Sequence, residues 1–225
     1  MNNKYSRILT IILVILVIGI VGLLVFFGVD TFRKQSLDKE ASNILDGYDD
    51  FLDNGGGDIF VDEPTGDLPT LDANLMTNSL TPESNGNNQE GYMYKGYEVI
   101  GKIEIPKTNV EYPILKDTTK NSIEVAIAYL YGAYPNEVGN MVLVSHNFRD
   151  GRLFSNNKKL SNGDIIYITD NSGRRLKYEI YNTYVTDRED FDYATRDTEG
   201  RREISLSTCT DDVKQVLIIW AKEAN

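Results

Sequence analysis

The hydrophobic and polar positions divide the chain into three parts, of which the first is an apolar run. Residues 8–29 contain no charged side chain. As a helix rising about 1.5 Å per residue, this run would be roughly 33 Å long, enough to cross the hydrocarbon core of a bilayer. A cleaved secretory signal is shorter and ends at a small-residue cleavage site, and the residues after this run offer no good site of that kind. The pattern favours an uncleaved transmembrane helix, but basic residues on both sides of it leave its orientation open.

The second part, residues 30–90, is polar and acidic. Residues 35–52 contain enough helix formers to predict a short juxtamembrane helix, with Gly47 as its weak point. The stretch from about 53 to 90 is rich in Asp, Asn, Gly, Thr and Pro. It offers too little apolar surface to offset the entropy of ordering it. We expect a flexible acidic linker there, and an ordered acidic subdomain is the alternative.

The third part, residues 91–225, alternates short strand-like runs with turn signals and is long enough for one hydrophobic core. Seven or eight short strands rich in Ile, Val and Tyr predict a mainly β fold, either a closed barrel or a sandwich. Two further segments, 122–132 and 152–160, could supply short helices between the strands. The predicted strands cover residues 97–105, 110–115, 141–146, 164–170, 175–185, 203–209 and 215–221.

The charge of the chain says little about partners, because it is concentrated in one segment. Residues 41–94 contain eleven acidic residues and no Lys or Arg, and the formal net charge of the whole chain is −11. The remaining residues are therefore neutral overall and predict no nucleic-acid groove. The single cysteine excludes an intramolecular disulfide and a multi-cysteine metal site.

Two side chains that can carry nucleophilic chemistry each occur once in the sequence. His146 ends the apolar run MVLVS, and Cys209 ends the run EISLST. A lone cysteine at a strand end is most often a small buried hydrophobe, and a lone histidine there is usually exposed or hydrogen-bonded. The catalytic interpretation requires both side chains at the same end of the barrel, within reach of each other.

The sequence resembles the bacterial sortases over roughly residues 97–223. Its most specific segment is Ser-Leu-Ser-Thr-Cys at 205–209, which is similar to the family motif Thr-Leu-x-Thr-Cys. His146, in SHN followed by DGRLF, is a second match. The resemblance implies a closed eight-stranded β-barrel with short helices, after one transmembrane helix. Sortases act outside the cell, which implies a single-pass cell-membrane protein with residues 1–7 in the cytoplasm and residues 91–225 as an extracellular catalytic domain.

The resemblance also implies roles for individual residues and partners. Sortases are cysteine transpeptidases that join surface proteins to the Gram-positive cell wall or to one another. Cys209 would be the nucleophile that forms an acyl-thioester with a sorting signal of the LPxTG type, and His146 the general acid and base. Thr208 would line the substrate groove. The implied partners are sorting-signal-bearing surface proteins and an amine nucleophile of peptidoglycan or a pilin; no cofactor is implied, and we assign no metal ligands.

The sequence departs from the family in one respect. Sortases carry an Arg on the strand after the cysteine, where it helps to bind substrate and stabilise the oxyanion, and Val216 aligns with that Arg. Lys214 or Gln215 could substitute for it. Alternatively, Arg149 or Arg152 could reach in from elsewhere, or activity could be low. Because strand alternation puts Lys214 on the face of Val216, about 6.6 Å along the strand, we expect Lys214 to supply the substrate-binding charge.

Three functions remain open for this set of residues. The first is the transpeptidase, and the second is a sortase-derived module that binds sorting signals or partner proteins without turnover. The third is an unrelated cysteine peptidase, which would hydrolyse peptides with no preference for an amine acceptor. Within the sortases, the segment 186–202 is too short for the long helix that class B enzymes insert there, which makes a class A-like or class D-like architecture more plausible. The segments YPIL and SHNFRDG also resemble class B, so the class stays open.

Overall fold

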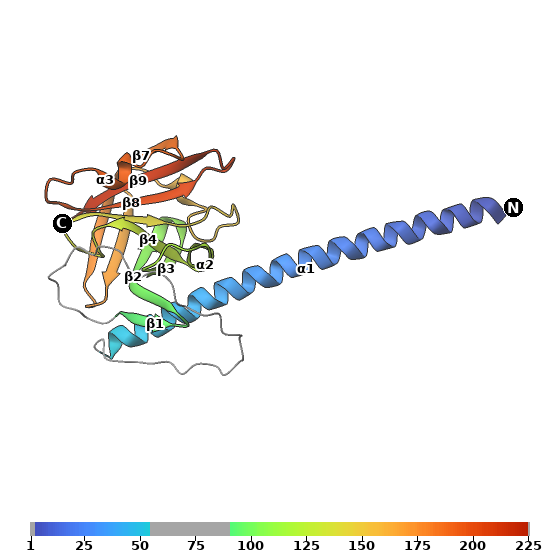
Figure 1. Cartoon of the computed structure of the whole chain (residues 1–225), viewed down its shortest axis with the longest axis horizontal. Coiled ribbons are helices and arrows are strands. Elements are labelled where there is room, and N and C mark those ends of the chain that lie inside the picture. Colours follow the sequence, from blue (N-terminus) through green and yellow to red (C-terminus); the bar gives the residue numbers. More distant parts are fainter. Residues whose placement is uncertain (1–2, 55–90, 225) are drawn as a thin grey trace, which may run out of the picture. The chain divides into compact units, whose positions relative to one another are not determined.

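The computed structural model describes residues 3–54 and 91–224, so the acidic linker expected from about 53 to 90 lies almost wholly outside the described residues. The chain divides into two compact units, Met1–Asn43 and Ile44–Asn225. Helix α1 (Asn3–Asp53) includes the predicted juxtamembrane helix and ends within the second unit (Figure 1). Within the described residues it is the one helix long and apolar enough to cross a membrane, and its side chains from Ile8 to Val29 are exposed.

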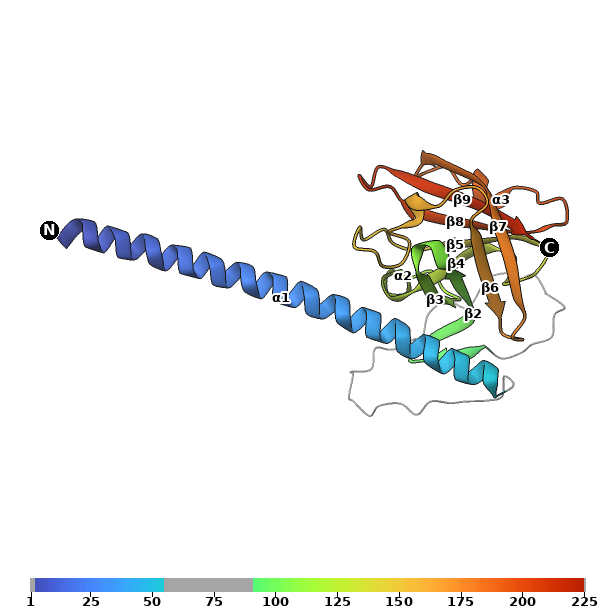
Figure 2. The same ribbon diagram turned by 180° about the vertical axis from the view of Figure 1, so that it is seen from behind.

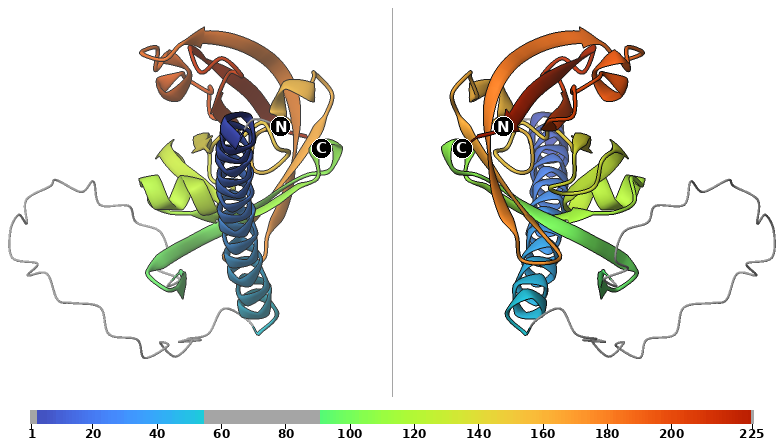
Figure 3. Two further views of the ribbon diagram at one scale, coloured as in Figure 1. Left: turned by 90° about the vertical axis from the view of Figure 1, so that its right-hand side faces the viewer. Right: turned by 90° about the vertical axis from the view of Figure 1, so that its left-hand side faces the viewer.

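The second unit is a closed β-barrel. Its strands follow the order β1-β2-β3-β4-β5-β8-β9-β7-β6, and β6 also pairs with β2, so that eight strands form a ring and β1 lies outside it. Figure 2 shows β6 and β7 side by side next to β2, and Figure 3 shows β7 (orange) curving over the barrel. The eight-stranded barrel implied by the resemblance is confirmed. The strands are β1 (Tyr92–Tyr94), β2 (Tyr97–Ile105), β3 (Val110–Leu115), β4 (Ile127–Gly132), β5 (Gly139–Val144), β6 (Ile165–Asp170), β7 (Arg175–Asp187), β8 (Arg202–Cys209) and β9 (Gln215–Glu223).

Short helices connect the strands, and they correct two expectations. The helix predicted over 122–132 ends early, because Ala126 is extended and the chain then enters β4. There the aromatic and β-branched residues of β4 pair with β3 and β5, and this tertiary pairing outweighs the local helical pattern. The helix predicted over 152–160 is limited to one 3₁₀ turn, η2. The helices of the barrel unit are η1 (Pro106–Thr108), α2 (Lys120–Val125), η2 (Asn157–Lys159) and α3 (Asp192–Thr195).

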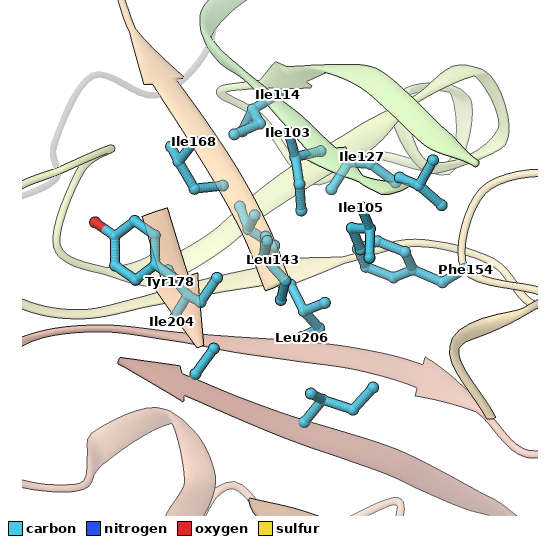
Figure 4. Packing of buried hydrophobic residues seen from close by; sticks show 14 of the residues in the cluster. Ile103, Ile105, Ile114, Ile127, Leu143, Phe154, Ile168, Tyr178, Ile204 and Leu206 are labelled. Carbon is cyan, nitrogen blue, oxygen red and sulfur yellow. The ribbon is translucent and has the colours of Figure 1, made fainter. Parts of the chain in front are cut away.

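Strand alternation separates an inner and an outer face on the neighbouring strands β5 and β8. Leu143 and Leu206 point into the main core inside the barrel. Val142 packs instead into a second cluster, with residues of β9 and α3 on the outer face. Since successive residues of a strand alternate between faces, Cys209 lies on this outer face. Figure 4 shows the inner core, which includes Ile103, Ile105, Ile114, Ile127, Leu143, Phe154, Ile168, Tyr178, Ile204 and Leu206.

The last turns of α1 belong to the barrel unit and pack against it. Tyr48 and Phe51 are buried and form an aromatic cluster with Tyr92 of β1. The hydroxyl of Tyr48 donates to Oδ1 of Asn171 at 2.9 Å. A Cβ atom at Gly47 would lie 2.0 Å from the hydroxyl oxygen of Tyr92, so the glycine lets the ring approach the helix. Gly47, which lowers the helix propensity of this segment, is thus required for the packing of Tyr92 against α1.

Candidate active site

The parallel pair β5–β8 brings His146 and Cys209 to one edge of the sheet. Val144, the last residue of β5, pairs with Ser207 in the parallel register. His146 lies two residues beyond Val144, and Cys209 lies two residues beyond Ser207. Because parallel partners advance in step along the sheet, the two side chains come to the same end of the barrel. The fold therefore places both residues at the same end of the barrel, which is the first of the two conditions that the catalytic interpretation sets.

Cys209 is the last residue of β8, and its side chain is neither fully buried nor fully exposed. It differs in this from the buried small hydrophobe that a lone strand cysteine usually is. Its backbone carbonyl accepts a hydrogen bond from Nδ2 of Asn147 at 3.0 Å. The same amide donates to Oδ1 of Asp211 at 2.9 Å. Asn147 thus ties the segment that carries His146 to the strand end that carries the thiol.

An open pocket of about 170 Å³ lies at the end of the barrel where β8 ends, and Cys209 is one of its lining residues. Thr208 also lines it, and its hydroxyl donates to the carbonyl oxygen of Ser145 at 2.9 Å across the parallel strands. Thr208 therefore holds the two strand ends together as well as bordering the pocket. The lining residues are Asn147, Phe154, Lys158, Val185, Thr208, Cys209, Thr210, Asp211 and Leu217.

His146 is half-buried beside the loop that follows it. Its ring centroid lies 4.9 Å from that of Phe148, and its carbonyl oxygen accepts from the backbone N–H of Phe154 at 3.2 Å. Burial lowers the pKa of the imidazole below its ordinary value, and the nearby Glu124 carboxylate partly opposes this shift. At neutral pH the imidazole is therefore mainly uncharged and can accept a proton.

Comparison with known proteins agrees with this geometry. The model of the sortase domain family matches residues 103–224. The chain belongs to the sortase family. It is 34% identical over 113 residues to sortase A of Bacillus anthracis and 29% identical over 163 residues to sortase D of Bacillus subtilis. Among solved structures it is similar to sortase A from Corynebacterium diphtheriae, with 29% identity and a TM-score of 0.53, and to a Clostridium perfringens sortase D5 transpeptidase, with 30% identity and a TM-score of 0.52.

These matches cover different shares of the relatives. The alignment with the Bacillus anthracis sortase covers 50% of this chain and 52% of that protein, whereas the one with the Bacillus subtilis sortase covers 68% and 80%. The structural matches cover 57% of this chain, with 62% of the Corynebacterium chain and 80% of the Clostridium chain. Both named classes, A and D, are thus among the relatives.

Among the described residues, the strand that follows Cys209 carries no cation at the position directly opposite it. Val216 pairs directly with Cys209 in the antiparallel register of β8 and β9. Lys214 lies in the turn just before β9, and its side chain is exposed. Its backbone N–H donates to Oδ1 of Asp212 at 3.2 Å. The alternation argument assumed that Lys214 is part of the strand, whereas β9 begins one residue later.

The two arginines considered as substitutes lie in the loop after His146. Arg152 is ion-paired with Asp150 at 2.9 Å, and its guanidinium carbon lies 4.7 Å from the ring centroid of Phe148. That ring in turn contacts His146. Arg149 has a positive φ of 61° and an exposed side chain, and its charge contributes to lowering the pKa of the Asp211 carboxyl.

The sequence argument missed three polar residues that the structure places at this site. Asn147 immediately follows His146 in the motif SHN, so its position carried a signal. Asp211 follows Cys209 by two residues, and nothing local shows that it faces the loop after His146. Lys158 belongs to a surface Lys-Lys pair that is distant from both motifs in sequence. Its ion pair with Asp211 at the end of β8 is a property of the folded barrel alone.

A buried polar network anchors the loop between β7 and β8 on the outer face. Glu203 is only 2% exposed, and it accepts hydrogen bonds from Tyr181, Arg196 and Arg201. These donors keep the pKa of its carboxyl below the ordinary value although burial acts in the opposite direction. The guanidinium of Arg196 also lies 4.6 Å from the ring centroid of Trp220 on β9. The loop is therefore fixed on the same face of the sheet as Cys209.

The sequence assigned no metal ligands. Among residues 3–54 and 91–224, no three His, Cys, Asp or Glu side chains are grouped as a metal site would require.

Proposed function

We propose that this protein is a membrane-anchored cysteine transpeptidase that cleaves a sorting-signal peptide of the LPxTG type and transfers it to an amine of the cell wall or of a pilin. The observation that carries the proposal is the meeting of the only cysteine and the only histidine at adjacent ends of the parallel strands β5 and β8. Membership of the sortase family supports the same chemistry. The relatives described as sortase A and sortase D leave the class open.

In the first half-reaction the Cys209 sulfur, deprotonated, attacks the scissile carbonyl carbon of the sorting signal. A C–S bond forms, and the carbonyl oxygen takes the negative charge. When this intermediate collapses, the C–N bond breaks and His146 donates a proton to the departing amine. The product is an acyl-thioester on Cys209, which retains the energy of the cleaved peptide bond for a second amine.

In the second half-reaction an amine of the acceptor attacks the thioester carbon, and His146 takes the proton that the amine loses. The C–S bond breaks and the thiol is regenerated, so that no net proton or electron is consumed. The lowered pKa of His146 suits it to the role of base at neutral pH. As a general acid it would first have to take up the proton released by the thiol.

The proposed function also includes a membrane anchor, which we assign to the apolar part of α1. Residues 8–29 of α1 form the apolar part of the one membrane-crossing candidate among the described residues. We infer a single-pass topology with the N-terminus in the cytoplasm and the barrel outside the cell, where sorting signals and wall amines meet. A protease-protection assay on intact cells would test it, since an external protease should reach the barrel in this orientation.

One observation favours a second function. Val216 lies opposite Cys209, where the family carries an Arg, so the site lacks one donor for the substrate and the oxyanion. Loss of a single oxyanion donor typically costs about 10²–10³ in rate. A module that binds sorting signals or partner proteins without turning them over is therefore the alternative.

The deciding experiment uses the full chain in detergent micelles with a library of sorting-signal peptides, with and without an amine acceptor. We expect amine-dependent product and a covalent acyl adduct at Cys209 detectable by mass spectrometry. Cys209→Ala and His146→Ala should abolish both, whereas Lys159→Ala, on the exposed surface, should change neither. Cleavage that continues in Cys209→Ala contradicts the nucleophile assignment. Binding without an adduct supports the module, and hydrolysis that ignores the amine supports a peptidase.

A further inference from the structure

The loop after His146 is closed on itself by backbone contacts. Asn147 and Leu153 form an isolated antiparallel bridge at its two ends. The backbone N–H of Phe154 donates to the carbonyl oxygen of His146 at 3.2 Å. Leu153 is only 1% exposed and belongs to the inner core, so the far end of the loop is anchored in the barrel. The residues between the two ends are therefore held in one short, closed turn next to His146.

The backbone of this loop is also strained. Arg149 and Leu153 have positive φ angles of 61° and 51°, a region that residues with a side chain seldom adopt. Such strain costs about 1–3 kcal/mol per residue and persists only where surrounding contacts fix the conformation. Oδ1 of Asn147 accepts from the N–H of Arg149 at 3.1 Å. Oδ1 of Asp150 accepts from the N–H of Arg152 at 3.2 Å, so local hydrogen bonds specify the shape of the loop.

This shape presents Phe148 to the imidazole of His146. The centroids of the two rings lie 4.9 Å apart, and the ring planes are tilted by 38°. Phe148 is partly buried and also packs against the inner core of the barrel. The guanidinium carbon of Arg152 lies 4.7 Å from the centroid of the phenyl ring, and Arg152 is ion-paired with Asp150 at 2.9 Å. The phenyl ring is thus held both by the core and by the loop.

The proposed reaction needs an imidazole of fixed orientation. His146 must take the proton of the thiol, give a proton to the departing amine and take one from the acceptor amine, and each transfer requires hydrogen-bond geometry. A displacement of about 1 Å can cost on the order of 100-fold in rate. In the described part of the chain, the imidazole has the ring of Phe148 and the carboxylate of Glu124 on α2 nearby. The ring contact limits rotation of the imidazole, whereas the carboxylate acts on it through charge.

We propose that Phe148 is a positioning residue for His146, and that Arg152 holds Phe148 in place from within the loop. The phenyl ring limits the rotation of the imidazole and shields one side of it from water. This shielding is part of the burial that lowers the pKa of His146, which Glu124 partly opposes. The role rests on the proposed transpeptidase function, but the state of the imidazole is measurable without any sorting signal.

The experiment uses the full chain in detergent micelles, with carbon-13 at the Cε1 position of histidine. Because His146 is the only histidine, one NMR signal reports both its titration and its motion. Phe148→Leu keeps an apolar side chain against the core and removes the flat ring. We expect it to increase the ps–ns motion of the imidazole and to raise the proton affinity of the imidazole at least about twofold. Phe148→Tyr keeps the ring and should match the parent in both.

Kinetics then separate positioning from structural support. Phe148→Leu should lower kcat about tenfold and change KM less than about twofold, because the substrate still binds and only proton transfer is misaligned. The acidic limb of kcat/KM, where the imidazole of the free enzyme titrates, should move to higher pH. Tyr131→Leu is the matched control, since Tyr131 is an exposed aromatic residue on β4, and it should change neither the NMR signal nor the rates.

Arg152→Gln tests the second contact, and it also applies if Phe148→Leu does not fold. Loss of the guanidinium should increase the motion of the imidazole in the absence of substrate, to a smaller extent than Phe148→Leu does. Arg149→Gln removes an exposed cation of the same loop and should leave this motion unchanged. If Arg152→Gln changes the rates and leaves the NMR signal unchanged, its guanidinium acts on the substrate, and this part of the proposal is wrong.

The remaining outcomes separate this proposal from the proposed function. An imidazole that is as rigid in Phe148→Leu as in the parent, and that titrates at the same pH, overturns the role of Phe148. An equal change in Tyr131→Leu overturns it as well. The expected NMR effects in a parent protein that turns over no sorting signal contradict only the proposed function.

Discussion

Val216 lies directly opposite Cys209 in the antiparallel register of β8 and β9. Its side chain packs against the apolar cluster on the outer face of the sheet, together with Trp220. Residues directly opposite in an antiparallel pair have Cβ atoms about 4.5–5.5 Å apart, so a long side chain at 216 would reach the reacting atoms. By the sequence argument this position corresponds to the Arg of other sortases, and here its side chain carries no donor.

Val216→Arg should therefore raise turnover of a sorting-signal peptide. The new guanidinium would provide donors for the oxyanion, and we expect kcat/KM to increase at least about tenfold. Val216→Lys should give a smaller gain, because an ammonium does not reproduce the planar fork of donors. Val216→Leu is the apolar control. A folded Arg variant with unchanged kcat/KM would show that a donor at this position does not limit the rate.

Thr208 should contribute to stability as well as to the site. Its hydroxyl is buried and donates to the carbonyl of Ser145 across the parallel strand ends. Thr208→Val keeps the shape and removes the donor, so we expect the free energy of unfolding to fall by about 1 kcal/mol in urea titrations. Thr208→Ser retains the hydroxyl and should lose less. If the Val variant is as stable as the parent, the hydrogen bond does not hold the strand ends together.

His146 should make stability depend on pH on the acidic side of neutrality. Burial lowers the pKa of His146 in the folded protein below the ordinary value of 6.5, so the unfolded chain binds the proton more readily. The stability due to the neutral imidazole is therefore fully present above about pH 6.5 and is lost as the pH falls from there toward the folded pKa. Between pH 8 and pH 5 the parent should lose more unfolding free energy than His146→Gln. Equal losses would mean that the imidazole of His146 has the same pKa in the folded and the unfolded protein.

Gly47 should be required for packing of the end of α1. A methyl group there would overlap the hydroxyl of Tyr92, which is only 2% exposed. Overpacking of this kind costs about 1–3 kcal/mol, which exceeds the gain of about 1 kcal/mol in helix propensity. Gly47→Ala should therefore lower the thermal midpoint of the barrel unit. Tyr92→Phe in the same chain should recover part of the loss, and a more stable Gly47→Ala protein would contradict this packing.

The sequence by itself determined the parts of this protein that depend on local pattern. The uninterrupted apolar run at 8–29 predicted a helix able to cross a membrane, because length and hydropathy are local properties. The strand over 97–105 was predicted correctly, since alternation and the following Pro106 mark it within a few residues. The motif around Cys209 and the unique His146 identified the family, which the family model confirms.

Only the tertiary structure decided the features that depend on register and on distant contacts. Whether Lys214 shares a face with Val216 depended on where β9 begins, and a difference of one residue changes the answer. The segment of β4 has a helical pattern, and its pairing with β3 and β5 overrides it. Lys158 pairs with Asp211 because the barrel brings η2 next to the turn that follows β8. Packing free energy is summed over neighbours in space, and a sequence pattern reports only neighbours along the chain.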